Sequence, residues 1–233
     1  GPRLLRQWLL PVLLTVTTFA LPYRKPQVGR DYWIQDDLLP DPMAVRERCL
    51  AKADWELGFP HRQERWPGMR AMPALLPEEL DQVEAWVKGA TGARKLWVEA
   101  SPEGATLNHN CVQVVGAQES GPRPHTDSRK LATYAGVLYL HPKPRPEGGT
   151  SFYRLKTPQG ALSGNLCPPQ CTYIHEAIGT RTLPLQAWHE ELAVPNRFNR
   201  LIVYRADLVH SASRYFGQAF EDRRMTAVFF WKA

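Results

Sequence analysis

Cysteine is scarce in this sequence, with only four residues in a chain of 233. So few cysteines, unevenly spaced, exclude a small domain held together by disulfide bonds and favour a reducing compartment, so we predict a cytoplasmic protein. Cys167, Cys171 and His175 follow one another at a spacing that is compatible with a zinc site. Two prolines between the cysteines oppose the helix that would align these ligands, and no fourth ligand is evident, so we favour a proline-rich surface loop.

Concentrated basic charge is also lacking. Lys and Arg number 29 against 23 Asp and Glu, a net charge of +6, but the basic residues are scattered along the chain. No aromatic-interleaved basic tract or nucleic-acid motif accompanies them, so we predict a solvated basic surface and no nucleic-acid partner. An anionic substrate or partner is the alternative. The hydrophobic share of 43% is typical of a globular protein with a sizeable core.

No uninterrupted apolar run is long enough to cross a bilayer. The apolar stretch at residues 4–20, LLRQWLLPVLLTVTTFA, is broken by polar residues and a proline. With Arg3 ahead of it the stretch has the outline of a signal peptide, but no small-x-small cleavage site follows Ala20. We therefore predict a short amphipathic helix at Leu4–Leu10 and a strand at Leu13–Ala20, both packed on the core, and keep secretion as the alternative.

Long linkers, internal repeats and low-complexity tracts are absent, so we predict a single domain over residues 1–233. Residues 3–94 are expected to supply the N-terminal strand and supporting helices, and residues 95–233 the core. Asp41 and Pro42 suit the cap and first position of a helix through MAVRERCLAKA. A second helix is expected from PEE at residues 77–79 through LDQVEAWV, and HRQERWPGMRA between the two is expected to be a loop.

From about residue 95 onward, short runs rich in Val, Tyr, Phe, Trp and Thr are separated by Pro and Gly. This pattern predicts many short strands and an antiparallel sandwich or barrel, in a mainly β (α+β) fold. The expected strands are KLWVEA, HNCVQVV, ATYAGVLYL, TSFYRL, QAWHEELAV, RLIVYRA and RMTAVFFWKA.

A possible set of metal ligands begins in PRPHTDSRKL, directly before the apolar run YAGVLYLHP. If this segment is extended, side chains alternate between its faces, so His125 and Asp127 point one way and Thr126 the other. His210, after the apolar strand that begins at Leu201, offers a third ligand. Two imidazoles and one carboxylate are the facial triad of non-haem Fe(II) oxygenases, which leaves metal positions open for a co-substrate and oxygen. For His210 alone, a satisfied core histidine is the alternative.

A basic and a hydroxyl residue follow this third ligand in EDRRMTAVFFWKA. In an extended segment Arg224 and Thr226 share one face. An arginine inside an apolar barrel needs an anionic partner, and a carboxylate suits its planar fork. A slip of one residue in strand register would exchange Arg223 and Arg224, and we prefer Arg224 because Thr226 shares its face.

Together these segments resemble the 2-oxoglutarate/Fe(II)-dependent dioxygenase superfamily, in particular its prolyl-hydroxylase-like branch and an uncharacterised bacterial group close to it. The resembling pieces, in chain order, are PHTD, VLYLHP, EGGTSFYR, FNRLIVY with His210, and RRMT, which cover roughly residues 105–233. The front of the chain is also similar to that bacterial group, through DDLLPDP and PGMRA.

The resemblance implies a double-stranded β-helix, the jelly roll of cupin-like proteins, with flanking N-terminal helices. It implies Fe(II) held by His125, Asp127 and His210, with 2-oxoglutarate and O2 as co-substrates. The implied reaction hydroxylates an unactivated C–H bond of a small molecule or amino-acid side chain and releases succinate and CO2. Related halogenases lack the carboxylate, so Asp127 favours hydroxylation, with desaturation, ring closure and N-oxidation as other outcomes.

The remaining site residues are implied in the same way. Arg224 would bind the distal carboxylate of 2-oxoglutarate with Thr226 beside it, and Tyr139 would donate a hydrogen bond to that carboxylate unless it is only a core residue. Candidate substrate contacts are Arg129, Phe152 and Arg154. The alternatives are a cupin-like metal-binding or sensing protein without turnover, and a metal dioxygenase that uses no keto acid. Neither requires an arginine downstream of the last ligand, so we favour the oxygenase.

Overall fold

The computed structural model describes residues 20–63, 65–101 and 108–233. The helix predicted at Leu4–Leu10 and the strand predicted at Leu13–Ala20 fall, apart from Ala20 itself, outside the described residues. No helix in the described part of the chain is long and apolar enough to cross a membrane. No disulfide bond links any of the four cysteines, all of which lie in the described residues.

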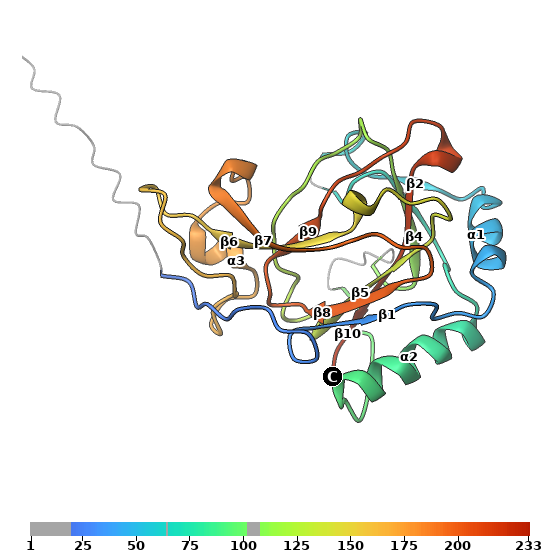
Figure 1. Ribbon diagram of the computed structural model, residues 1–233, viewed down its shortest axis with the longest axis horizontal. Helices are drawn as coiled ribbons and strands as arrows, with labels where there is room; N and C mark the ends of the chain where they lie inside the picture. Colours follow the sequence, from blue (N-terminus) through green and yellow to red (C-terminus); the bar gives the residue numbers. More distant parts are fainter. Residues whose placement is uncertain (1–19, 64, 102–107) are drawn as a thin grey trace, which may run out of the picture.

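Two antiparallel β-sheets enclose an apolar interior (Figure 1). The large sheet consists of β1 (Tyr32–Gln35), β2 (Glu56–Leu57), β3 (Met69–Ala71), β4 (Cys111–Val115), β5 (Tyr134–Tyr139), β8 (Leu201–Arg205) and β10 (Arg224–Trp231). The small sheet consists of β6 (Thr150–Leu155), β7 (Trp188–Val194) and β9 (His210–Ala212). The strand orders are β1-β8-β5-β10-β4-β3-β2 and β7-β6-β9. This architecture is the double-stranded β-helix predicted from the sequence.

Alternation along the strands separates two apolar layers. In β5, Ala135 and Tyr139 face the interior between the sheets, whereas Leu138 faces the opposite side of the large sheet. That outer side is covered by helices α1 (Pro42–Leu50) and α2 (Pro77–Thr91). Full burial of an aliphatic side chain contributes roughly 1.5–3 kcal/mol, so this outer layer stabilises the sheet and leaves its inner face available for a site.

Both helices are confirmed. Asp41 caps α1, because its side chain accepts a hydrogen bond from Ala44 N at 3.1 Å while Pro42 takes the first position. α2 ends at Gly92, whose φ of 79° lies in the left-handed region that glycine adopts without steric penalty. β1 and β3, both from the front of the chain, pair with the later strands β8 and β4 in the large sheet, and β2 extends the sheet by pairing with β3.

Three local predictions need correction. KLWVEA is not a strand, because only Trp97 bridges to another segment, at Lys232, and its side chains are mostly exposed. The predicted loop HRQERWPGMRA ends in β3, which exists because it pairs with β4. The proline-rich segment contains a short helix, α3 (Ile174–Ile178), which ends at Gly179. In each case the pairing partner or the packing partner is distant in sequence, and local composition does not reveal it.

Candidate functional site

His125 and His210 lie directly opposite each other in the fold. They form an antiparallel bridge in which the backbone N–H of each donates to the carbonyl of the other at 3.0 Å. His210 is the first residue of β9, whereas His125 stands in the segment that precedes β5. Two residues further on, Asp127 N donates to Ala206 O at 3.0 Å, which keeps this segment extended.

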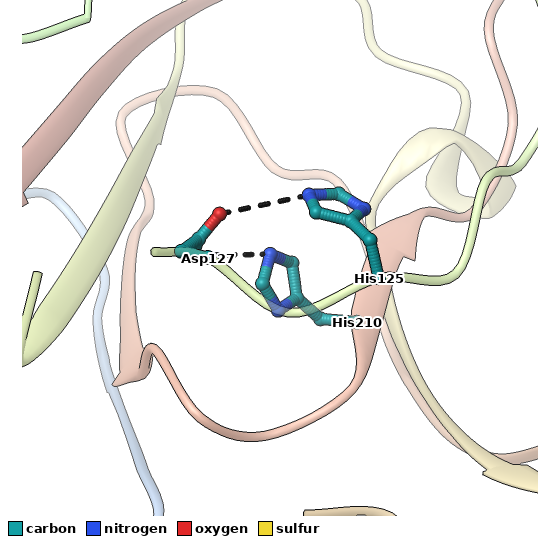
Figure 2. Close-up of side chains that lie close together, drawn as sticks. All are labelled: His125, Asp127 and His210. Atoms are coloured by element: carbon teal, nitrogen blue, oxygen red, sulfur yellow. Dashed lines mark ion pairs between the residues drawn. The ribbon is translucent and has the colours of Figure 1, made fainter. Parts of the chain in front are cut away.

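The extended segment brings His125 and Asp127 to the same side, facing His210 (Figure 2). His125 Nε2 lies 3.6 Å from Asp127 Oδ1, and His210 Nε2 lies 3.3 Å from Asp127 Oδ2. One ligand atom from each of the three side chains lies within 4.8 Å of the others. Thr126 points the other way, where its Oγ1 accepts a hydrogen bond from Ile174 N at 2.9 Å. The structure therefore brings the three predicted ligands together.

Backbone carbonyls determine which ring nitrogen of each histidine carries hydrogen. His125 Nδ1 lies 2.7 Å from Arg123 O, and His210 Nδ1 lies 2.7 Å from Leu208 O. A carbonyl oxygen only accepts hydrogen bonds, so both Nδ1 atoms must be the protonated ones. In the neutral rings Nε2 then presents a lone pair toward Asp127. This second hydrogen bond is the arrangement that orients histidines toward a metal ion.

Asp127 provides the test of whether these residues fit a cation. Desolvation would raise the pKa of its carboxyl group, but the positive charges that His210 and His125 carry when protonated outweigh it and hold that pKa well below its usual range. Asp127 Oδ2 is buried and accepts no hydrogen bond of good geometry from the described residues. Two imidazole lone pairs and a carboxylate at these distances repel one another unless a proton or a cation lies among them. The donor set fits Fe(II).

Within the described residues, 20–63, 65–101 and 108–233, one group of histidine, cysteine or acidic side chains lies close enough together to share a metal ion. This group is His125, Asp127 and His210. Cys167 Sγ instead donates to the carbonyls of Pro168 and Cys171. The zinc site considered for Cys167, Cys171 and His175 therefore has no geometric support.

Arg224 is buried, with 5% of its surface exposed, at the start of β10. Its Nε donates to Gly148 O at 2.7 Å and its Nη2 to Gly149 O at 3.0 Å. Arg223 is directed outward, where it pairs with Glu119 at 3.1 Å. The register of β10 thus puts Arg224, rather than its neighbour, on the inner face of the large sheet.

Thr226 and Tyr139 lie beside this arginine on the same inner face. Thr226 is paired with Tyr139 across β10 and β5, and both are buried. The Tyr139 hydroxyl lies 2.6 Å from Thr150 Oγ1 on the small sheet, and the Arg224 guanidinium carbon lies 5.7 Å from the Tyr139 ring. Burial raises the pKa of Tyr139, so its hydroxyl remains a hydrogen-bond donor at neutral pH.

Two tyrosines that the sequence interpretation missed also line this interior. The Tyr204 ring lies 4.3 Å from that of His210, and the Tyr215 ring lies 5.6 Å from the Arg224 guanidinium carbon. Burial raises the pKa of both hydroxyls, with the Asp127 charge adding to the effect at Tyr204. Alternation in RLIVYRA would have placed Tyr204 on the inner face with Ile202, but no comparable signal exists for Tyr215, which lies in a loop.

The three predicted substrate contacts are placed differently from one another. Phe152 is fully buried on β6 opposite His210, with its ring 5.8 Å from that of Tyr204. Arg129 donates to the carbonyls of Cys167 and Cys171 at 2.9 and 3.0 Å, which ties down the proline-rich segment. The Arg154 guanidinium carbon lies 3.7 Å from the Tyr23 ring, and Arg154 Nε donates to Ser163 O. Of the three, only Phe152 contacts the interior next to the candidate metal ligands.

Comparison with known proteins places the chain in a family. Residues 23–165 match DUF6445, a family of unknown function, over more than half of the chain. The chain belongs to this family. The matched DUF6445 region contains His125, Asp127 and Tyr139 and ends before His210 and Arg224. No curated protein matches the sequence.

Solved structures share the fold of this DUF6445 protein at low sequence identity. SnoK, a non-heme alpha ketoglutarate dependent carbocyclase from nogalamycin biosynthesis, is 14% identical with a TM-score of 0.52 over 87% of this chain and 79% of SnoK. AviO1 from Streptomyces viridochromogenes Tue57 is 15% identical with a TM-score of 0.51 over 88% of this chain and 91% of AviO1. These similarities support the double-stranded β-helix architecture.

Proton binding at the candidate ligands predicts how metal binding depends on pH. Desolvation favours neutral His125, but the hydrogen bond and charge of Asp127 outweigh it and raise the pKa of His125. Only the neutral imidazole binds a metal, so Fe(II) affinity is expected to fall, by up to about tenfold per pH unit, as the pH drops through this raised pKa. Titrations of the protein with Fe(II) at about pH 6 and about pH 8 check this, and binding is expected to be tighter at the higher pH.

The metal-free protein is expected to show the opposite trend. Protonated His125 pairs with Asp127 and so stabilises the folded protein. This stabilisation is fully present below the pKa that histidine has in the unfolded chain. It is lost as the pH rises through the raised pKa of His125 in the folded protein. Thermal unfolding with and without Fe(II), at the same two pH values as the metal titrations, measures this change in stability. A metal-induced rise in Tm that is the same at both pH values would contradict His125 as a ligand.

Proposed function

We propose that this protein is an Fe(II)- and 2-oxoglutarate-dependent oxygenase. The observation that carries the proposal is the convergence of two imidazole Nε2 atoms and one carboxylate within 4.8 Å, with both Nδ1 atoms bonded to backbone carbonyls. The fold adds support, because SnoK, which shares it, is an alpha ketoglutarate dependent enzyme. Fold similarity alone does not determine activity, so the proposal depends on the site.

In this proposal His125, Asp127 and His210 hold Fe(II) on one face. Bound Fe(II) and 2-oxoglutarate supply the oxidising chemistry, in which O2 is consumed, succinate and CO2 are released and a substrate C–H bond is oxidised. Arg224 binds the distal carboxylate of the keto acid through its guanidinium. Thr226 and the Tyr139 hydroxyl offer hydrogen bonds to the same carboxylate, and their burial excludes competing water.

The proposed reaction is hydroxylation of an unactivated C–H bond in a small molecule or amino-acid side chain. Asp127 supports this outcome, because a carboxylate in the third ligand position leaves no place for a halide. Ring closure is the second outcome to test, since the carbocyclase SnoK shares the fold. We further propose that the chain forms one catalytic domain, because β1 and β3 from the front of the chain pair with the later strands β8 and β4 in the large sheet.

Anaerobic titration of the purified protein with Fe(II) and then 2-oxoglutarate tests the proposal without a known substrate. A chelated keto acid gives a weak visible charge-transfer band, which is expected to saturate at one equivalent and to disappear when oxygen is admitted, with succinate formed. Iron binding without this band would contradict a keto-acid site and favour a metal protein of another kind. Failure to bind iron would remove the basis of the proposal altogether.

A further inference from the structure

A cavity of about 190 Å³ adjoins Asp127 on the inner side of β10. This volume is below the range of about 300–1,000 Å³ that accommodates drug-sized ligands, so the cavity suits a group about as large as one amino-acid residue. Much of its wall is apolar. Its lining includes Val98, His109, Asp127, Leu131, Tyr173 and Phe230. Asp127 is the one candidate metal ligand in this lining, so the cavity adjoins the candidate metal site at that residue.

His109 owes its position in this wall to a gap in the β-ladder. Pairing of β10 with β4 ends at Val228 and Cys111, and the next bridge on that edge is formed by Lys232 with Trp97. Between them, the Phe230 backbone N–H donates to His109 Nδ1 at 3.0 Å. The imidazole therefore takes the place of a strand carbonyl and is held rigidly.

This hydrogen bond also determines the tautomer of His109. A backbone N–H only donates, so Nδ1 must be unprotonated and the ring hydrogen must be on Nε2. Burial lowers the pKa of His109 to about 4, so the ring is neutral across the physiological range. The Phe229 and Trp231 rings pack against it at interplanar angles of 73° and 76°, with centroids 5.9 and 5.6 Å away. With Nδ1 directed at β10, the Nε2–H is the polar group that this ring offers to the cavity.

We propose that this cavity is the substrate pocket and that His109 Nε2–H donates a hydrogen bond to an uncharged oxygen, a carbonyl or hydroxyl, on an amino-acid-sized substrate group. The inference rests on the proposed oxygenase function and specifies its substrate class. An anionic group is disfavoured because the carboxylates of Asp127 and Glu99 line the same cavity. A cationic group is disfavoured at His109 because the neutral N–H donor has no lone pair to offer it. The two carboxylates that would attract a cation are already engaged, Asp127 by the proposed metal ion and Glu99 by Trp97 Nε1, which donates to it at 2.7 Å.

Two substitutions separate the proposed contact from the structural role of His109. In His109→Asn the side-chain oxygen is able to accept from Phe230 N, as Nδ1 does, but the donor at the Nε2 position is lost. In His109→Gln the terminal amide restores a donor near the Nε2 position but leaves Phe230 N without its acceptor. His189→Asn, at an exposed position on β7, is the matched control for a histidine-to-asparagine change.

The probe is 2-pyrrolidinone, a neutral lactam of suitable size, compared with the anion cyclopentanecarboxylate and the cation pyrrolidinium. Binding of each probe to the full chain is followed in two ways. Without metal, NMR of ¹⁵N-labelled histidine side chains reports on His109. With Fe(II) and 2-oxoglutarate under anaerobic conditions, the probe is expected to perturb the keto-acid band. The expected result is a shift at His109 Nε2 with the lactam bound more tightly than either ion. Loss of one hydrogen bond should weaken lactam binding about tenfold in His109→Asn, and His109→Gln should stay within about threefold.

Unchanged lactam affinity in His109→Asn, a protonated Nδ1, or tighter binding of either ion would overturn the inference. An intact keto-acid band with failed lactam binding contradicts this inference alone. Conversely, a missing band with lactam binding that depends on His109 contradicts the proposed oxygenase function while recognition by His109 stands. His189→Asn should match the wild type in every measurement, and a tenfold loss there would show that the effect in His109→Asn is not specific to the pocket.

Discussion

Substitution of Asp127 by Asn is expected to lower the affinity for Fe(II) by at least about 100-fold, because loss of an outer-shell partner of a metal ligand alone costs about 10–100-fold. The amide keeps the shape of the side chain but removes the one anionic ligand of the three. Two imidazoles then remain to hold a divalent cation, with no charge to neutralise it. His125→Ala and His210→Ala are expected to have effects of similar size.

Equilibrium titration with Fe(II) under anaerobic conditions measures the affinity, and thermal unfolding of the metal-free variants shows whether each still folds. His189→Ala is the matched control, because this histidine is exposed on β7 outside the candidate site. Full iron affinity in two of the three site variants would show that the ligand assignment is wrong. A loss of affinity that follows a loss of folded protein would be structural in origin, so the metal-free Tm must be measured for each variant.

The arrangement of these three residues was accessible from the sequence because two of them are close in the chain. Alternation along an extended strand places His125 and Asp127 on one side without knowledge of the fold. His210 required the additional assumption that a late strand returns beside the early segment. The observed bridge between His125 and His210 satisfies that assumption.

Features that depend on distant contacts were not accessible in this way. KLWVEA has the composition of a strand, but its only ladder contact is one bridge from Trp97. β3 lies in a segment with no strand signal and exists through its pairing with β4. His109 was part of a predicted strand, yet β4 begins only two residues later, at Cys111, and this histidine acts as an acceptor for β10.

Arg129 illustrates the same limit for a predicted substrate contact. Its place just after Asp127 suggested a contact at the entrance to the site. The structure instead directs its guanidinium to the carbonyls of Cys167 and Cys171, about forty positions further along the chain. A long loop without periodic sequence gives no indication of where its carbonyls lie, so this contact was outside the reach of sequence reasoning.

Substitution of Arg224 by Met is the second change with a large expected effect, on 2-oxoglutarate. Truncating one partner of a buried, hydrogen-bonded charge pair costs about 2–5 kcal/mol, so the affinity for 2-oxoglutarate is expected to fall by about 30-fold or more. Methionine preserves much of the length and apolar volume of the side chain. Fe(II) affinity should stay near that of the wild type, because Arg224 is not one of the three candidate ligands.

Arg224 also has a structural role that the experiment must separate from keto-acid binding. Its Nε and Nη2 atoms donate to the carbonyls of Gly148 and Gly149, so Arg224→Met is expected to lower Tm by leaving these acceptors unsatisfied. Arg224→Lys keeps a positive charge but not the planar fork of the guanidinium. Its affinity for 2-oxoglutarate should fall between that of the wild type and that of Arg224→Met. The readout is the keto-acid band at saturating Fe(II), measured at a temperature where every variant is folded.

Arg223→Met is the matched control, because Arg223 precedes Arg224 directly but faces outward and pairs with Glu119. Its effect on 2-oxoglutarate affinity is expected to be within about threefold, because this partly buried ion pair lies away from the inner face of the large sheet that carries Arg224. Equal and small effects of the two substitutions would contradict the assignment of Arg224 as the carboxylate anchor, because one residue of strand register should separate a cavity-facing arginine from a solvent-facing one. A large effect of Arg224→Met on Tm without any change in the band would leave this arginine with a purely structural role at the turn formed by Gly148 and Gly149.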